Sequence, residues 1–327
     1  MRIVLAFDKF KGTADALELI DAATQALAST CDVVAQPLAD GGEGSLAALG
    51  GPNKETTVTG PLGQPVRARW RLDGRTASIE MAESSGLTLA GGPEGNDPIG
   101  ATTRGVGELI NKTLELRVQQ LQVFLGGSAT TDGGLPALEV LSAPSRLQAV
   151  DVVIATDVST SFLDAAEVFG PQKGATAAQT TFLRRRLESV AQIYRDRYGV
   201  DVTGVPGTGA AGGLAGGLYA LGGRIEPGFD VVASHVGFDE MLGQADLVIT
   251  GEGHLDAESF SGKVVGSVWR WAKDFDLPVL AVVGQVDRDV PIPAGMEVIS
   301  ISEEYGMEAA MAQPADLVAK LLESRFG

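Results

Sequence analysis

The chain is poor in cysteine, histidine and positive charge, and each shortage excludes a class of protein. It has one cysteine, Cys31, so no internal disulfide can form, and its first residues, Met1–Asp8, lack the long apolar stretch of a signal peptide. Both features predict a reducing, cytoplasmic location. The cysteine and the two histidines, His235 and His254, lie far apart in the sequence, which argues against a zinc site.

Positive charge is scarce: the chain has 25 Lys and Arg residues but 42 Asp and Glu residues, which gives a formal net charge of −17. Such a surface repels other polyanions, so we expect no nucleic-acid and no membrane partner. No stretch reaches the roughly 18 uninterrupted apolar residues that a membrane-spanning helix needs. With 44% hydrophobic residues, the composition is that of a folded protein.

The chain has 327 residues, which predicts two domains at about 150 residues each. Short aliphatic runs alternate with helical patterns, which is typical of an α/β fold with a mostly parallel sheet. Between Thr56 and Glu80 the residues alternate as in an antiparallel meander, and the last part of the chain returns to the first pattern. We therefore expect a discontinuous domain over 1–55 plus 240–327, and an inserted mixed α/β domain over 56–239.

The expected elements follow from these patterns. The clearest strands are 3–7, 33–36, 121–125, 152–155, 247–250, 279–283 and 298–301. The clearest helices are 14–28, 43–49, 105–114, 178–198, 209–221, 263–273 and 316–324.

Glycine is abundant instead: 43 of the 327 residues are glycine, where an average protein has about 7%. Many of them gather in four turns that follow predicted strands, at 40–45, 126–134, 207–213 and 251–256. In open α/β sheets, ligands bind beyond the carboxyl ends of the strands. We therefore expect the four turns to form one shared site.

Three of these turns combine glycines with acidic residues, which is typical of sites for a metal–phosphate group. Carboxylates hold Mg²⁺, and the backbone N–H groups of the turns bind phosphate oxygens. Phosphoryl transfer also needs cations near the moving charge. Four lysines lie beside such turns: Lys9, Lys11, Lys173 and Lys263. The residues therefore favour phosphoryl transfer.

Other interpretations of the turns stay open. An Asp or Thr ahead of a helix is commonly an N-cap, so Asp8, Thr131 and Asp132 could each be structural. Segment 207–212 matches the G-x-G-x-x-G pattern of dinucleotide sites, with Glu226 about 20 residues further on, so a nicotinamide-dependent oxidoreductase is a rival hypothesis. A third hypothesis is a protein that binds a small anion without turnover.

Six segments match the motifs of one family in order. They are Asp8–Gly12, Leu38–Gly44, Gly126–Gly134, Val168–Ala175, Gly207–Gly213, and Asp246–Asp256 with Gly262-Lys263. In these segments, and from Met1 to the C-terminal helix, the chain resembles the type I glycerate kinase family. The resemblance implies two α/β domains, one of them Rossmann-like and discontinuous, with the active site in the cleft between them. It also implies ATP- and Mg²⁺-dependent phosphorylation of D-glycerate, most often at the 2-hydroxyl.

Some positions depart from the family pattern. The segment between Gly134 and Asp151 is shorter, Asp157–Ser161 replaces Asp-Val-x-Asn-Pro, and His254 replaces a common Arg. Asn96-Asp97-Pro98 stands where Arg-Asn-Pro is common, so we expect an anion-binding arginine to be missing.

The working hypothesis is that the glycerate hydroxyl attacks the γ-phosphate of MgATP. Lys11 is expected to neutralise the glycerate carboxylate or the γ-phosphate, and Asp40 or Asp256 to orient or deprotonate the hydroxyl. Asp132 and Glu252 are expected to hold Mg²⁺, directly or through water. The expected substrate- and nucleotide-binding residues are Asp8, Lys9, Gly41, Gly42, Glu43, Gly127, Ser128, Thr130, Lys173, Gly207, Gly209, Gly212, Gly213, Gly251, Gly253 and Lys263. The choice of base among the carboxylates, the phosphorylated hydroxyl (2 or 3) and a homodimer stay open.

Overall fold

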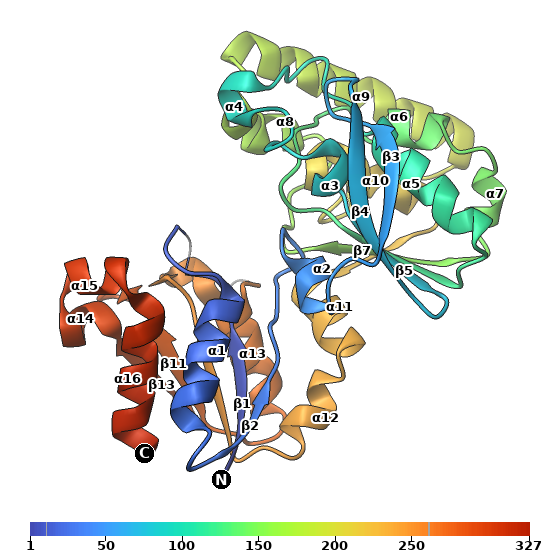
Figure 1. Cartoon of the computed structure of the whole chain (residues 1–327). Coiled ribbons are helices and arrows are strands. Elements are labelled where there is room, and N and C mark those ends of the chain that lie inside the picture. The colour runs from blue at the N-terminus through green and yellow to red at the C-terminus, as the bar shows by residue number, and fades with distance from the viewer. Residues whose placement is uncertain (11, 261) are drawn as a thin grey trace. The chain divides into compact units, whose positions relative to one another are not determined.

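The computed structural model describes every residue of the chain except 11 and 261 (Figure 1). The chain forms two compact units, Met1–Asp40 with Val232–Gly327, and Gly41–Val231. The predicted fold class is confirmed: both units are α/β, and the first is built from both ends of the chain. Among the described residues, no helix combines the length and the apolarity that crossing a membrane requires.

The first unit contains a five-stranded parallel sheet in the order β13-β11-β9-β1-β2. Its strands are β1 (Arg2–Phe7), β2 (Asp32–Ala35), β9 (Leu247–Gly251), β11 (Val279–Val283) and β13 (Met296–Ser300). A short parallel pair joins β10 (His254–Leu255) to β12 (Gln285–Val286). Its helices are α1 (Ala16–Leu27), α12 (Phe238–Leu242), η3 (Ala257–Phe260), α13 (Val264–Lys273), α14 (Ile301–Tyr305), α15 (Met307–Ala312) and α16 (Pro314–Phe326).

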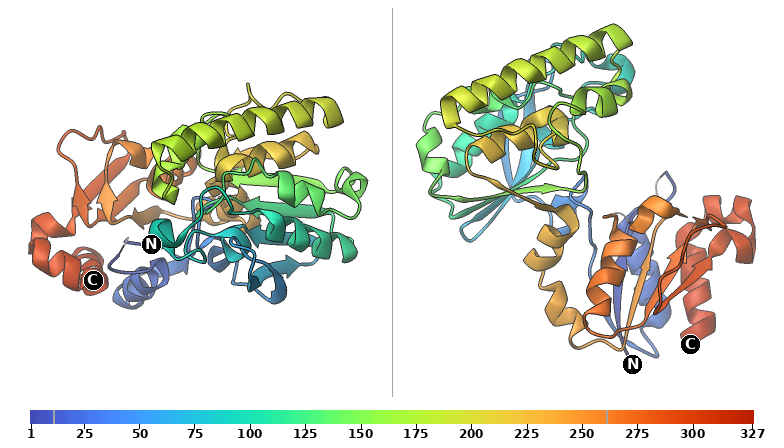
Figure 2. Two further views of the ribbon diagram at one scale, coloured as in Figure 1. Left: turned by 90° about the horizontal axis from the view of Figure 1, so that it is seen from above. Right: turned by 180° about the vertical axis from the view of Figure 1, so that it is seen from behind.

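Helices cover both faces of this sheet because its strands are apolar on both sides. Ile3, Leu5 and Phe7 of β1 pack in one core cluster with Leu19 and Ile20 of α1. Helices α1 and α16 contact each other, and the right-hand view of Figure 2 shows α13 on the opposite face of the sheet. Buried parallel strands have this continuous apolar character, which is why the sequence located them well.

The second unit contains a six-stranded mixed sheet in the order β3-β4-β5-β6-β7-β8. Strands β3 (Lys54–Thr59), β4 (Pro65–Asp73) and β5 (Thr76–Glu80) form the predicted antiparallel meander, and β6 (Gln120–Phe124), β7 (Asp151–Thr156) and β8 (Arg224–Pro227) continue it in parallel. The helices are α2 (Ser45–Ala48), α3 (Ala82–Ser85), α4 (Gly92–Gly95), α5 (Arg104–Glu115), α6 (Leu135–Glu139), α7 (Pro144–Leu147), α8 (Ala165–Phe169), η1 (Pro171–Lys173), α9 (Ala177–Tyr198), η2 (Ala210–Gly213) and α10 (Leu214–Ala220). Helix α11 (Gly228–His235) spans the division between the units.

The units divide at different residues from those expected, 40/41 and 231/232 rather than 55/56 and 239/240. Residues 41–55 belong to the second unit because α2 packs against β5, where the Leu46 N–H donates to Glu80 at 2.6 Å. The expected helix 43–49 is shorter, since Gly44 adopts a left-handed φ of 104° and helix α2 starts only at Ser45. The expected helix 209–221 is broken, because Ala211 and Gly212 have φ of 53° and 64°.

Helix α1 begins with a capping box that makes a testable contribution to stability. The Asp15 carboxylate accepts the Glu18 N–H at 2.8 Å, and the Glu18 carboxylate accepts the Asp15 N–H at 3.0 Å. We expect Asp15→Ala to lower the free energy of unfolding by about 1 kcal/mol, because it leaves a helix N–H without its acceptor. Urea unfolding measures this, with Asp21→Ala on the exposed side of the same helix as the control, where a change within about 0.5 kcal/mol is expected. Equal midpoints for the two variants would contradict the assignment.

Candidate active site

In the first unit, the carboxyl ends of β1 and β9 place two acidic residues side by side. Phe7 and Gly251 are register partners in these parallel strands, and the Asp8 N–H donates to the Gly251 carbonyl at 2.9 Å. Asp8 and Glu252 are therefore the first residues beyond two adjacent strands. This is the edge at which ligands bind in open parallel sheets.

Asp8 is a half-buried carboxylate close to other charges. One of its oxygens accepts the Lys9 N–H at 2.8 Å. Burial, and then the negative charge of Asp40, raise the pKa of Asp8 to about 6, while Lys9 and Lys263 act to lower it. Asp40 thus lies close enough to Asp8 for the two carboxylates to interact.

Glu252 is only 6% exposed, and its buried Oε1 atom has no hydrogen-bond partner among the residues that the structure describes. Burial raises the pKa of Glu252 to about 7, against the hydrogen bond from Ser259 and the charge of Lys263, and Asp8 and Asp256 raise it further. A buried carboxylate oxygen without a partner costs free energy. An unpartnered buried carboxylate oxygen is therefore a candidate for binding a ligand or a metal ion.

The turn after Glu252 brings Asp256 and Lys263 together. Asp256 accepts hydrogen bonds from the Ser259 N–H at 3.0 Å and from Lys263 Nζ at 3.3 Å. Burial acts to raise the pKa of Asp256, but the hydrogen bond and charge of Lys263, together with Ser259, lower it overall. His254 pairs with Asp287 at 2.8 Å on the exposed side of the turn, so it contributes no second metal ligand to this cluster.

In the second unit, two of the glycine turns touch each other through their backbones. A Cβ atom on Gly126 would lie 2.3 Å from the Gly42 Cα. The two turns could therefore not come this close to each other if residue 126 had a side chain. Gly127, Glu43 and Gly44 are exposed beside this contact, and Ser128 is half-buried. The predicted residues Gly41, Gly42, Glu43, Gly127 and Ser128 are therefore close together.

Asp132 holds structure within the second unit. One carboxylate oxygen accepts the N–H and the hydroxyl of Thr103 at 2.7 and 2.9 Å, and the other accepts the Gly134 N–H at 2.9 Å. The residue is 5% exposed, and burial raises its pKa against these hydrogen bonds. The geometry favours the structural interpretation of Asp132, which ties the start of α5 to the glycine turn.

Lys173 is 3% exposed and bonds to the same turn. Its Nζ donates to Ser128 Oγ and to the Thr130 carbonyl, both at 2.7 Å. Burial lowers the pKa of Lys173 to about 7, and the charge of Asp132 opposes this. Lys173 therefore fixes the turn that carries Ser128 and Thr130.

Asn96, at the position where the family pattern commonly has an arginine, also bonds to this turn. Its amide Nδ2 donates to the carbonyls of Ala129 and Lys173 at 3.0 and 2.9 Å. It thereby joins the segment after α4 to the two elements that carry Ser128 and Lys173. A neutral amide that binds backbone carbonyls therefore stands where the family pattern commonly has a cation.

The G-x-G-x-x-G segment is buried throughout, and its glycines serve packing. A Cβ on Gly212 would lie 2.0 Å from the Thr130 carbonyl oxygen, and the N–H groups of Gly209 and Gly213 already donate to carbonyls. No described strand directly precedes the segment, whereas a dinucleotide fingerprint requires one. Gly212 and Gly213 therefore pack against the Thr130–Gly133 turn, whereas Gly207 and Gly209 pack against residues 158–161.

The predicted residues fall into two clusters, one in each unit. The first contains Asp8, Lys9, Asp40, Gly251, Glu252, Gly253, Asp256 and Lys263. The second contains Gly41, Gly42, Glu43, Gly127, Ser128, Thr130, Asp132, Lys173 and the buried Gly207–Gly213 segment. Lys11, predicted as catalytic, lies outside the described residues.

Sequence reasoning missed Glu80, the last residue of β5, which is 6% exposed. The signal was present in the alternation of Thr76–Glu80: Ala77 and Ile79 enter the core cluster, so Ser78 and Glu80 point to the other face. A carboxylate at the carboxyl end of a buried strand meets the criteria that selected Asp8 and Glu252.

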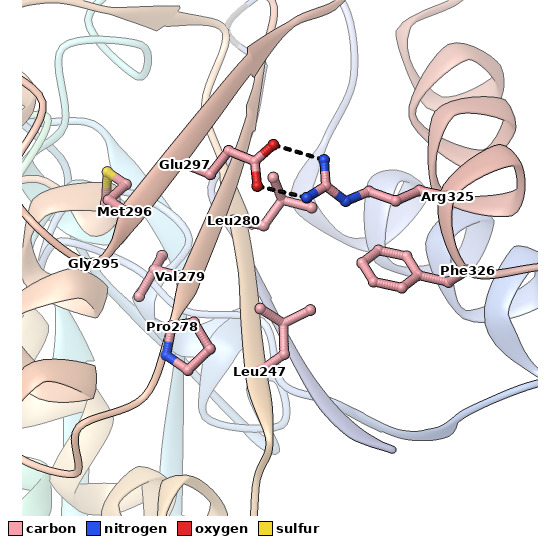
Figure 3. Close-up of a pocket in the computed structure, with 9 residues that line it drawn as sticks. All are labelled: Leu247, Pro278, Val279, Leu280, Gly295, Met296, Glu297, Arg325 and Phe326. Carbon is pink, nitrogen blue, oxygen red and sulfur yellow. Dashed lines mark hydrogen bonds and ion pairs between the residues drawn. The ribbon is translucent and has the colours of Figure 1, made fainter.

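A hollow of about 360 Å³ lies at the other edge of the first sheet (Figure 3). Leu247, Val279 and Met296, the first residues of β9, β11 and β13, line it, and the Glu297–Arg325 pair spans one side. It is therefore at the amino ends of the strands, away from Asp8 and Glu252. The hollow is not part of the candidate active site.

Comparisons with known proteins point to one family. A model described as "Glycerate kinase family" matches residues 3–144 and 138–325. A glycerate kinase of Bacillus subtilis (strain 168) is 38% identical, over 88% of this chain and 86% of its own. A glycerate 2-kinase of Escherichia coli (strain K12) is 35% identical, over 89% and 87%. A solved structure of a protein assigned as glycerate kinase 2 in Salmonella typhimurium LT2 has a TM-score of 0.80 at 31% identity and covers 99% of this chain and 98% of its own.

Proposed function

Since this chain belongs to the glycerate kinase family, we propose that it transfers the γ-phosphoryl group of ATP to the 2-hydroxyl of D-glycerate, giving ADP and 2-phosphoglycerate. The choice of the 2-hydroxyl is supported by the Escherichia coli relative described as a glycerate 2-kinase. The observation that carries the chemistry is the pair of carboxylates, Asp8 and Glu252, beyond two adjacent parallel strands.

The residues present fit a magnesium ion that arrives with the nucleotide. Among the described residues, no group of three or more His, Cys, Asp or Glu side chains is arranged to hold a metal by itself. Mg²⁺ in kinases is bound through one or two carboxylates together with phosphate oxygens. Glu252, whose buried Oε1 lacks a partner, and the adjacent Asp8 match this description better than the fully bonded Asp132. When bound, the ion neutralises charge on the triphosphate.

The chain's own residues orient the reactants and manage the proton. Of the two predicted bases, Asp256 is already bonded to Ser259 and Lys263, which lowers its pKa and makes it a weak base. We therefore favour Asp40 as the group that accepts the hydroxyl proton. Asp40 lies close enough to Asp8 to raise the pKa of the Asp8 carboxyl. Lys263 supplies positive charge beside this group of acids.

The exposed glycine turns of the second unit are proposed to contact phosphate oxygens. Glu43 and Gly127 are exposed in these turns, and the half-buried Ser128 hydroxyl lies next to Gly127. The buried Gly207–Gly213 segment supports these turns instead of binding the nucleotide itself. Backbone N–H groups in such turns bind anions without the like-charge repulsion that an acidic protein otherwise imposes.

An ADP-release assay tests the proposed function. We expect ADP to form from MgATP only when D-glycerate is added, with L-glycerate and other hydroxy acids at least ten times slower, about 1.4 kcal/mol of discrimination. Phosphorus NMR should identify the product as 2-phosphoglycerate. Formation of 3-phosphoglycerate would overturn the regiochemistry alone, and no ADP release with any hydroxy acid would overturn the kinase assignment.

A further inference from the structure

Glu80 connects the sheet of the second unit to the glycine turn at 41–44. Its Oε1 accepts the Leu46 N–H at 2.6 Å across 34 residues of sequence, and the Gly44 N–H bonds to the same carboxylate. Both N–H groups belong to the segment that leads from the turn into α2. A carboxylate that accepts several backbone N–H groups fixes the backbone that carries them.

The other contacts of the turn show what Glu80 adds. Gly41 is so close to Gly228 that a Cβ would lie 2.5 Å from the Gly228 Cα, and Gly42 is equally close to Gly126. Ser45 Oγ donates to the Gly42 carbonyl at 2.7 Å. These contacts hold residues 41 and 42, but Glu43 and Gly44 are exposed. The bonds to Gly44 and Leu46 therefore fix the part of the turn that is open to a ligand.

A carboxylate placed here costs free energy, and its hydrogen bonds to the turn offset part of that cost. Burial raises the pKa of Glu80 to about 6; the Leu46 and Gly44 N–H groups act against this, and Glu83 and Glu43 add to the rise. Arg69 interacts with Glu80 through its charge but is hydrogen-bonded to Glu83, with Nη2 2.7 Å from Oε1. A neutral side chain would avoid the cost but would hold the two N–H groups less strongly.

We propose that Glu80 is a positioning residue that fixes the Gly41–Gly44 turn in the geometry that binds the phosphates of the nucleotide. It acts through the backbone of Gly44 and Leu46 and does not itself touch the ligand. The proposal rests on the proposed kinase function, because that function places phosphates at this turn.

The test compares Glu80→Ala, Glu80→Gln and Glu83→Gln. We expect Glu80→Ala to raise KM for MgATP at least tenfold with kcat within threefold of wild type, and its 41–50 peptide to exchange amide hydrogens faster. Glu80→Gln should recover most of the loss, because its amide oxygen still accepts the Leu46 N–H. Glu83→Gln removes a neighbouring charge that pairs with Arg69, and both readouts should stay at wild-type values.

Each alternative outcome is informative. If Glu80→Ala exchanges amide hydrogens faster but keeps its KM for MgATP, the role of Glu80 is purely structural and the proposal is overturned. Unchanged exchange in Glu80→Ala would also overturn the proposal. If the wild-type chain binds MgATP but does not phosphorylate glycerate, the proposed function fails alone. The same variants are then compared by their Kd for MgATP, and an unchanged Kd in Glu80→Ala overturns the positioning role.

Discussion

Replacing Glu252 by glutamine is expected to abolish most turnover while making the protein more resistant to unfolding. Glu252 is the buried carboxylate whose Oε1 has no partner, and glutamine keeps its size but not its charge. We expect kcat/KM to fall at least about 100-fold, a loss near 2.7 kcal/mol of transition-state stabilisation. The assay is ADP release at saturating D-glycerate with varied MgATP.

The gain in stability follows from the direction of the pKa shift. Because the pKa of Glu252 is raised from 4.5 to about 7, the folded state binds the proton more tightly than the unfolded chain. The contribution of Glu252 to the free energy of unfolding is therefore greatest below pH 4.5. It is lost as the pH rises through about 7, and the loss is on the order of 2–3 kcal/mol. Glu252→Gln lacks this loss, so its melting temperature at pH 8, in EDTA, should exceed that of wild type.

Glu258→Gln is the matched control. Glu258 belongs to the same turn, but its side chain is 83% exposed. We expect its activity and its melting temperature to match those of wild type. A Glu252→Gln variant that keeps more than a third of wild-type kcat/KM would show that this carboxylate is not part of the reaction site.

The sequence predicted the fold best at the buried parallel strands, where the apolar pattern locates each strand and the shared strand direction locates the carboxyl ends. The buried strands stand out because both of their faces are apolar, and parallel strands send all their carboxyl ends to one edge. The strands expected at 3–7 and 247–250 are indeed adjacent and parallel, so Asp8 and Glu252 follow neighbouring strands although 243 residues separate them. The strand expected at 298–301 begins earlier, at Met296, and Ile301 already belongs to α14.

The sequence was less informative where tertiary contacts override a local pattern. The Gly209–Leu221 run has the composition of one helix, yet Ala211 and Gly212 adopt left-handed angles so that Gly212 can meet the Thr130 carbonyl. Nothing local to residues 207–213 reveals that contact, which is made by a turn about 80 residues away. The role of Lys173 was hidden for the same reason: a lysine beside glycines resembles a phosphate ligand until its acceptors, Ser128 and Thr130, are known.

Exchanging Lys173 for methionine is expected to reduce activity strongly, because the turn that carries Ser128 and Thr130 loses a buried donor. Methionine fills similar space but cannot donate to Ser128 Oγ or to the Thr130 carbonyl, so the turn that carries both loses its two 2.7 Å hydrogen bonds. We expect kcat/KM to fall about 30-fold or more, near 2 kcal/mol. Lys112→Met, on the exposed face of α5, is the control and should leave the activity unchanged.

A double-mutant cycle with Ser128→Ala separates positioning from direct binding. If Lys173 acts through the turn, the Ser128→Ala change should cost clearly less in the Lys173→Met background than in wild type, because the hydroxyl is no longer held in place. Full additivity would mean that Lys173 contributes independently of Ser128, and the positioning role would be wrong.

The pH dependence of stability gives a second, activity-free measurement on Lys173. Its pKa falls from 10.5 to about 7 on folding, so between these values the unfolded chain binds the proton and the folded protein does not. Stability therefore rises with pH across this window in wild type. In Lys173→Met that rise should be smaller when urea unfolding is measured at pH 7 and pH 9. An equal rise in both proteins would show that the ammonium group is not buried in solution as it is in the structure.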